Sequence, residues 1–324
     1  MKTNQTEINQ NVFRKNYNHS DSGKIFLIGL LAPLFLALLF SFIASSIAQS
    51  NEVKVESVTS GFGYVIPYMI CTFLLFIAIY FVYNKVNKIE FSAIKPNFKM
   101  KWHTYLIIIA IGLISLFGIQ YFIGAVDNGL KAVGFPVQEG LSIINPTNAG
   151  TYILAVLLLA LLPAIGEELM FRGMILHGLR TRFSDVVSVV LSALMFALMH
   201  TNLQQFVYPF LLGLIMGWIV LRTGSVISSM LVHFVNNFTV VTFSFIENLT
   251  GFSLSLGSSW WFYLIAVLLL VATFAICFLI DKFYFKQKSK EEVEKTEKKT
   301  DKFIYISLAV GGVLLILMTI LQLR

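Results

Sequence analysis

Long apolar stretches, separated by short polar segments, run through most of this chain of 324 residues. Since an α-helix needs about 20 apolar residues to cross the hydrocarbon core of a bilayer, such stretches predict membrane-spanning helices. We identify nine windows, at Ile25–Ala48, Tyr64–Tyr83, Tyr105–Val126, Thr151–Phe171, Val186–Met199, Phe206–Leu221, Val226–Phe245, Trp260–Ile280 and Phe303–Leu323. The predicted fold is therefore all-α, a polytopic transmembrane helical bundle of eight to nine spans.

The polar segments between these windows predict the organisation of the chain. Residues 25–150 hold three spans, and residues 151–248 form a core of four helices. The other segments are a disordered cytoplasmic tail at 1–24, an eighth span at 249–281, a charged cytoplasmic linker at 282–302 and a ninth span at 303–324.

Composition and charge agree with a membrane protein. The chain is 57% hydrophobic and only 13% charged, which excludes a soluble domain of this size. The net charge of +7 does not indicate a nucleic-acid partner, because the basic residues lie in short loops between apolar windows. All of the 24 Lys and Arg residues except Lys54, Lys131 and Arg324 fall on one predicted side. The excess of positive charge predicts a multi-pass protein of the cell membrane with a cytoplasmic N-terminus.

Candidate chemistry begins in the fourth window, where Gly166–Gly173 reads GEELMFRG. Charges are costly inside a membrane, so ionisable residues at this depth are functional candidates. Residues four apart share a helix face, which predicts an ion pair between Glu168 and Arg172. That pair is explained equally well as a structural cluster. Glu167 points elsewhere and has no predicted partner, and a desolvated, unpaired carboxylate is suited to act as a general base.

Two later windows hold further polar groups. His200 directly follows the window Val186–Met199, with Phe196 four positions before it on the same face. His233 lies within the seventh window, and Asn237 shares its face. Each is explicable alone, as a helix cap or as an interhelical hydrogen-bonding group. Their concentration in three of the nine windows favours one shared site, which we expect to face the cytoplasm.

Three motifs occur in order along these windows: Glu167-Glu168-x-x-x-Arg172, Phe196-x-x-x-His200 and His233-x-x-x-Asn237. Together they resemble the CAAX-protease and bacteriocin-processing (CPBP, or Abi) family of intramembrane endopeptidases, and are similar to the Ras-converting type II CAAX prenyl endopeptidases. The resemblance covers about Thr151–Phe245. The other windows match only in hydropathy, and a ninth span exceeds the roughly eight that the family implies.

This resemblance implies a glutamate-dependent protease. Glu167 would activate a water molecule. His200 would help to position the reacting groups or to protonate them. His233 and Asn237 would donate hydrogen bonds to the oxyanion of the tetrahedral intermediate, a role that often contributes most to such catalysis.

The same resemblance implies a supporting role for the ion pair and leaves the metal open. Glu168 paired with Arg172 would hold the helix end and tune Glu167. We expect no cofactor, with zinc held by Glu167, His200 and His233 as the alternative, because these are ligand types that zinc accepts.

The predicted function is hydrolysis of peptide bonds in peptide or membrane-protein substrates within the lipid bilayer. Candidate substrates are peptide pheromones, bacteriocin leaders and prenyl-type C-termini, with a peptide-secretion system as a partner. One alternative is a non-catalytic scaffold or immunity protein that binds a sensor kinase or a toxin. Another is a transporter that uses buried Glu and His groups for proton coupling.

Overall fold

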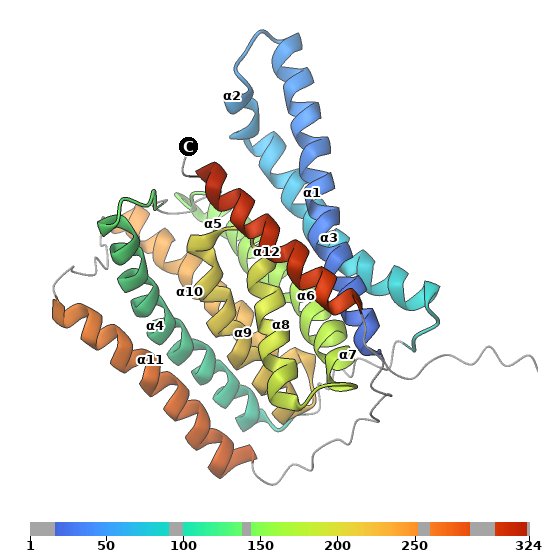
Figure 1. Cartoon of the computed structure of the whole chain (residues 1–324). Helices are drawn as coiled ribbons and strands as arrows, with labels where there is room; N and C mark the ends of the chain where they lie inside the picture. Colours follow the sequence, from blue (N-terminus) through green and yellow to red (C-terminus); the bar gives the residue numbers. More distant parts are fainter. Residues whose placement is uncertain (1–16, 91–99, 138–143, 252–259, 286–301, 323–324) are drawn as a thin grey trace, which may run out of the picture.

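The computed structural model describes residues 17–90, 100–137, 144–251, 260–285 and 302–322, and in these residues it contains helices and no strand (Figure 1). The predicted all-α bundle is confirmed. The elements in chain order are α1 (His19–Ser50), α2 (Val55–Thr59), α3 (Phe62–Val86), α4 (Trp102–Ala132), α5 (Ala149–Ala155), η2 (Val156–Leu161), α6 (Leu162–Glu168), η3 (Leu169–Ile175), α7 (Leu176–Arg180), α8 (Asp185–Met199), α9 (Leu203–Thr223), α10 (Val226–Thr250), α11 (Trp260–Ile280), η4 (Asp281–Phe285) and α12 (Lys302–Gln322).

Each of the nine predicted windows corresponds to a helix. In the described part of the chain, eight helices are long and apolar enough to cross a membrane, and the α5–α7 run counts as one of them. The exception is α8, whose 15 residues extend over about 22 Å at 1.5 Å per residue. The last window forms α12 and is one of the eight. The chain is therefore a multi-pass membrane protein.

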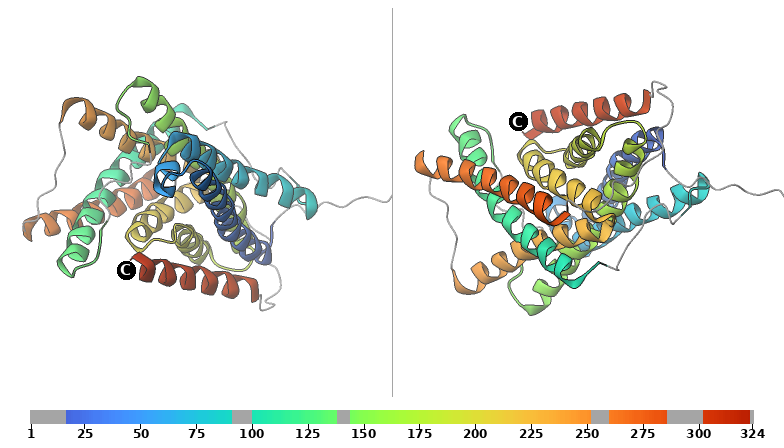
Figure 2. Two further views of the ribbon diagram at one scale, coloured as in Figure 1. Left: turned by 90° about the horizontal axis from the view of Figure 1, so that it is seen from above. Right: turned by 90° about the horizontal axis from the view of Figure 1, so that it is seen from below.

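The helices of the predicted core lie in the middle of the bundle (Figure 1). They are the α5–α7 run, α8, α9 and α10. On one side α4 packs against α10 and carries α11 on its outer face, and on the other α1 packs against α3 and η3. The C-terminal helix α12 packs against α1 and α8, and the views from either end show it lying along the outside of the bundle (Figure 2).

The N-terminal segment corrects one prediction. The tail was expected to be disordered through residue 24, but α1 begins at His19 and Tyr17 is buried. Asn18 is the N-cap of α1 and forms a capping box with Asp21, which satisfies backbone N–H groups of the first turn. The hydroxyl of Tyr17 also donates to Asn84 at the end of α3, at 2.6 Å. Residues 1–16 lie outside the described residues.

Helix ends that the charge pattern assigned to one side meet at one end of the bundle. Thr104 at the start of α4 hydrogen-bonds to Tyr284 of η4 at 2.7 Å. Arg222 near the end of α9 pairs with Asp281, also in η4, with 2.7 Å between Nη2 and Oδ2. The start of the predicted linker at 282–302 is thus part of a helical turn, and residues 286–301 lie outside the described residues.

Candidate active site

Glu167 and Glu168 end helix α6, between two π-helical segments. The segment η2 precedes α6 and η3 follows it, so one long helix is twice locally widened. Such π-helical segments are frequent at functional sites because they change the direction of neighbouring side chains. The apolar pattern of the window did not predict them.

Pro163 adds a second irregularity to this helix. Proline has no N–H, so the usual α-helical hydrogen bond to the carbonyl of Leu159 is not made. The side chain of Asn237 on α10 donates to this carbonyl instead, at 2.9 Å. Pro163 is visible in the sequence and is the signal from which an external donor for Leu159 could have been expected.

The predicted ion pair between Glu168 and Arg172 is present. Arg172 Nη1 lies 2.7 Å from Glu168 Oε1, and both side chains are fully buried. Arg172 Nη2 also donates to the carbonyl of Gly213 on α9, at 3.4 Å. A Cβ at position 213 would lie 3.1 Å from that nitrogen, so glycine permits this close approach. The Gly213 contact has no signal in the sequence spacing.

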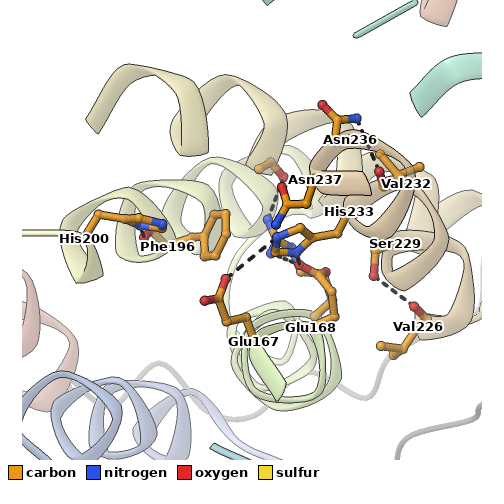
Figure 3. Close-up of polar contacts among 12 residues, drawn as sticks. Glu167, Glu168, Phe196, His200, Val226, Ser229, Val232, His233, Asn236 and Asn237 are labelled. Atoms are coloured by element: carbon orange, nitrogen blue, oxygen red, sulfur yellow. Dashed lines mark hydrogen bonds and ion pairs between the residues drawn. The ribbon is translucent and has the colours of Figure 1, made fainter. Parts of the chain in front are cut away.

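His233 connects the two glutamates. Its Nδ1 lies 3.0 Å from Glu168 Oε1, and its Nε2 lies 3.9 Å from Glu167 Oε2 (Figure 3). An ionised carboxylate only accepts hydrogen bonds, so in this contact Nδ1 carries the hydrogen atom and donates the hydrogen bond to Glu168. The Nε2 atom therefore faces Glu167, and Glu168 fixes the orientation of the ring.

The adjacent glutamates have different surroundings. Glu168 Oε1 accepts from both Arg172 and His233. Glu167 is 9% exposed, and its closest described ionic contact, at 3.9 Å to His233, is too long for a direct hydrogen bond. The sequence prediction that Glu167 points away from the ion pair is confirmed.

His200 caps the C-terminal end of α8 beside this cluster. Its Nδ1 lies 3.0 Å from the carbonyl oxygen of Phe196. The Phe196 ring makes edge contacts with both histidines, at centroid distances of 5.2 Å to His200 and 6.0 Å to His233. Among the described contacts no hydrogen bond joins His200 to Glu167. The structure thus places His200 next to the cluster, on the other side of an aromatic ring.

Comparison with known proteins agrees with this geometry. Residues 149–239 match the model of the family described as type II CAAX prenyl endopeptidase Rce1-like. This segment, less than a third of the chain, is therefore similar to the Rce1-like family. No curated protein and no solved structure matches the chain. At the family level, this match supports an intramembrane CAAX-type protease, and all of the candidate residues lie within the match.

The Rce1-like core holds a second asparagine that the sequence did not single out. Asn236 is fully buried; its Oδ1 accepts from Tyr208 of α9 at 2.6 Å, and its Nδ2 donates to the Gly112 carbonyl of α4 at 2.8 Å. Asn236 and Asn237 thus tie α10 to three neighbouring helical elements. An oxyanion role for Asn237 remains a prediction.

A zinc site is not preformed in the Rce1-like core. Among the residues that the structure describes, no three His, Cys, Asp or Glu side chains are grouped so as to hold a metal ion. The set Glu167, His200 and His233 that was considered for zinc does not have this arrangement.

Proposed function

We propose that this protein is an intramembrane endopeptidase in which Glu167 activates the water molecule that hydrolyses the peptide bond. The observation that supports this most strongly is the contrast between adjacent carboxylates. Glu168 is held by Arg172 at 2.7 Å and by His233 at 3.0 Å, whereas among the described residues Glu167 has one ionic contact, at 3.9 Å to His233. A buried carboxylate without a hydrogen-bond donor retains its capacity to accept a proton from water.

Charge balance supports a division of work between Glu167 and His233. Two carboxylates and one guanidinium lie together in a buried setting, so one further proton makes the cluster neutral. In the reactive state that we propose, His233 holds this proton, so that Glu167 acts as the base while the Nε2–H of His233 is available to an oxyanion. Low polarity around the cluster strengthens both interactions.

The proposed reaction proceeds in two proton transfers. Glu167 takes a proton from water as the water oxygen bonds to the peptide carbonyl carbon, and the negative charge develops on the carbonyl oxygen beside His233 Nε2–H. The carbon–nitrogen bond then breaks as the proton passes from Glu167 to the leaving amine. No metal takes part.

The other residues have supporting roles in this proposal. Glu168 fixes the tautomer and orientation of His233, as a carboxylate does for the histidine of a hydrolytic triad. Arg172 keeps Glu168 ionised. Asn237 holds the α6 helix through Leu159, with oxyanion donation as its second proposed role, and His200 assists in positioning or protonation from across the Phe196 ring.

We further propose that the substrates are peptides or membrane proteins that reach the site from the bilayer. Peptide pheromones, bacteriocin leaders and prenyl-type C-termini are the candidate classes. The protein is proposed to lie in the cell membrane with a cytoplasmic N-terminus, beside a peptide-secretion system or a sensor kinase.

Comparative peptidomics tests this function even though the substrate is unidentified. Cells would carry wild-type protein, Glu167→Gln, or Glu56→Gln as a matched control in the exposed helix α2. We expect a set of cleaved peptides in wild-type and Glu56→Gln cells that is missing in Glu167→Gln cells. Identical peptide sets in all three would contradict the protease and leave the scaffold interpretation.

Elemental analysis distinguishes the proposed metal-free mechanism from a zinc-dependent one. We expect purified protein to contain no stoichiometric zinc. About one zinc per chain, lost together with activity in His200→Ala and His233→Ala, would make the protein a metalloprotease.

A further inference from the structure

Phe196 is an apolar residue at the centre of the polar cluster. Its ring lies under the guanidinium of Arg172, with 4.5 Å from Cζ to the ring centroid. The same ring makes edge contacts with His233 and His200, and its side chain is only 2% exposed. Phe196 therefore touches three site residues but is shielded from a substrate.

The buried cation of Arg172 is stabilised by the face of the Phe196 ring. The guanidinium is fully buried and has five N–H donors, and its Nε has no hydrogen-bond partner among the described atoms. The face of an aromatic ring carries negative electrostatic potential, so it attracts a cation placed over it, most strongly where water is excluded. The Phe196 ring compensates for hydrogen bonds that Arg172 does not make.

The position of Arg172 affects the position of His233, because both side chains donate to the same atom of Glu168. Its Nη1 and the Nδ1 of His233 both donate to a single atom, Glu168 Oε1, at 2.7 and 3.0 Å. A displaced guanidinium would therefore shift Glu168, and with it the His233 ring whose Nε2 faces Glu167.

We propose that Phe196 is a positioning residue of the active site, holding Arg172 by a cation–π contact and, through Glu168, aligning His233 with Glu167. This inference rests on the proposed proteolytic function. It differs from a role in core packing, because it requires the electrons of the ring and not only its volume.

Fluorinated phenylalanines separate these two roles. Successive fluorine atoms weaken the negative potential of the ring face while changing its size little. Incorporated at position 196, mono-, di- and trifluorophenylalanine should lower kcat stepwise, by roughly tenfold over the series, which corresponds to losing most of a desolvated cation–π contact. KM should stay unchanged, because the ring does not touch the substrate.

The matched control is the same series at Phe26, which is equally buried but whose described ring contact is with Phe171. Fluorination there should leave kcat unchanged. Melting in detergent gives an independent readout. With Arg172 present, the melting temperature should fall over the Phe196 series. In the Arg172→Met background, which lacks the cation, the melting temperature should stay constant over the series.

The outcomes are distinguishable. An unchanged kcat over the Phe196 series would overturn the positioning role, whether or not melting changes. A fall in kcat that occurs equally at Phe26 would also overturn it. If wild-type protein cuts no peptide, the proposed function fails and this inference falls with it, while the melting series still reports on the contact between ring and guanidinium.

Discussion

Two buried carboxylates, Asp21 at the start of α1 and Glu167 in α6, have opposite surroundings. Asp21 Oδ1 accepts from the hydroxyl of Tyr83 at 2.8 Å, and its Oδ2 accepts from the backbone N–H of Asn18, also at 2.8 Å. The described ionic contact of Glu167 is the one with His233, at 3.9 Å. Asp21 is thus stabilised by its neighbours, whereas Glu167 is kept without such partners.

The position of each carboxylate in its helix explains part of this difference. Asp21 lies in the first turn of α1, where free N–H groups and the helix dipole favour a negative charge. Glu167 lies well inside the Ala149–Arg180 span, where backbone donors are used within the helix. A carboxylate inside a membrane span costs stability, and such a group is more readily retained where it has a chemical task.

The largest expected effect is that of Glu167→Gln on activity. Glutamine keeps the shape of the side chain but cannot accept the proton, so we expect turnover to fall by about 10² to 10⁴. The melting temperature should stay within error of wild type, because no described hydrogen bond is lost. Turnover of an identified substrate and melting in detergent check both parts, and equal activity would refute the glutamate mechanism.

The next effect concerns the ion pair. Glu168→Ala leaves the buried guanidinium of Arg172 without its carboxylate, and Arg172→Ala leaves the buried Glu168 with His233 alone. Each change should therefore lower the free energy of unfolding by about 3 to 5 kcal/mol and reduce activity as well. Replacing both residues together should cost less than the sum of the single changes. Unfolding in detergent measures this, and unchanged stability in both single variants would mean that the pair does not form.

A smaller effect is expected at Asp21, with the opposite pattern to Glu167. Asp21→Ala leaves Tyr83 and the first turn of α1 without their acceptor, which should lower the free energy of unfolding by about 1 to 3 kcal/mol. Activity per folded molecule should be retained. Loss of turnover with full stability would reverse the comparison.

The smallest effect is that of Tyr83→Phe. This change removes one hydrogen bond while Asp21 keeps its backbone donor, so we expect a loss of about 0.5 to 1.5 kcal/mol. The same unfolding assay checks it, and a loss as large as that of Asp21→Ala would indicate that Tyr83 acts through more than this bond.

The sequence predicted what depends on local spacing. Apolar windows located the eight described helices that are long enough to cross a membrane and the shorter α8, and the four-residue step identified the Glu168–Arg172 pair. The start of α1 was missed, although Asn18 and Asp21 form a recognisable capping box. The polar composition of the segment led to the prediction that it is disordered.

The contacts that organise the site depend on residues far apart in the sequence. Phe196 approaches Arg172, and Asn237 reaches the Leu159 carbonyl, only because α8 and α10 pack around the same helix. The motif spacing indicates which helix faces these residues occupy, but not which atoms they meet. The four-residue spacing places the Phe196 ring beside His200, but the contact of this ring with His233 has no signature in the sequence.

The most direct test of the central claim is a single-turnover reaction in H₂¹⁸O. If Glu167 acts as a base toward water, the first turnover should place ¹⁸O in the new C-terminal carboxylate of the product and none in Glu167, as read by mass spectrometry of product and of digested protein. Label in the side chain of Glu167, with unlabelled product, would show that the carboxylate attacks the peptide itself and would contradict the account.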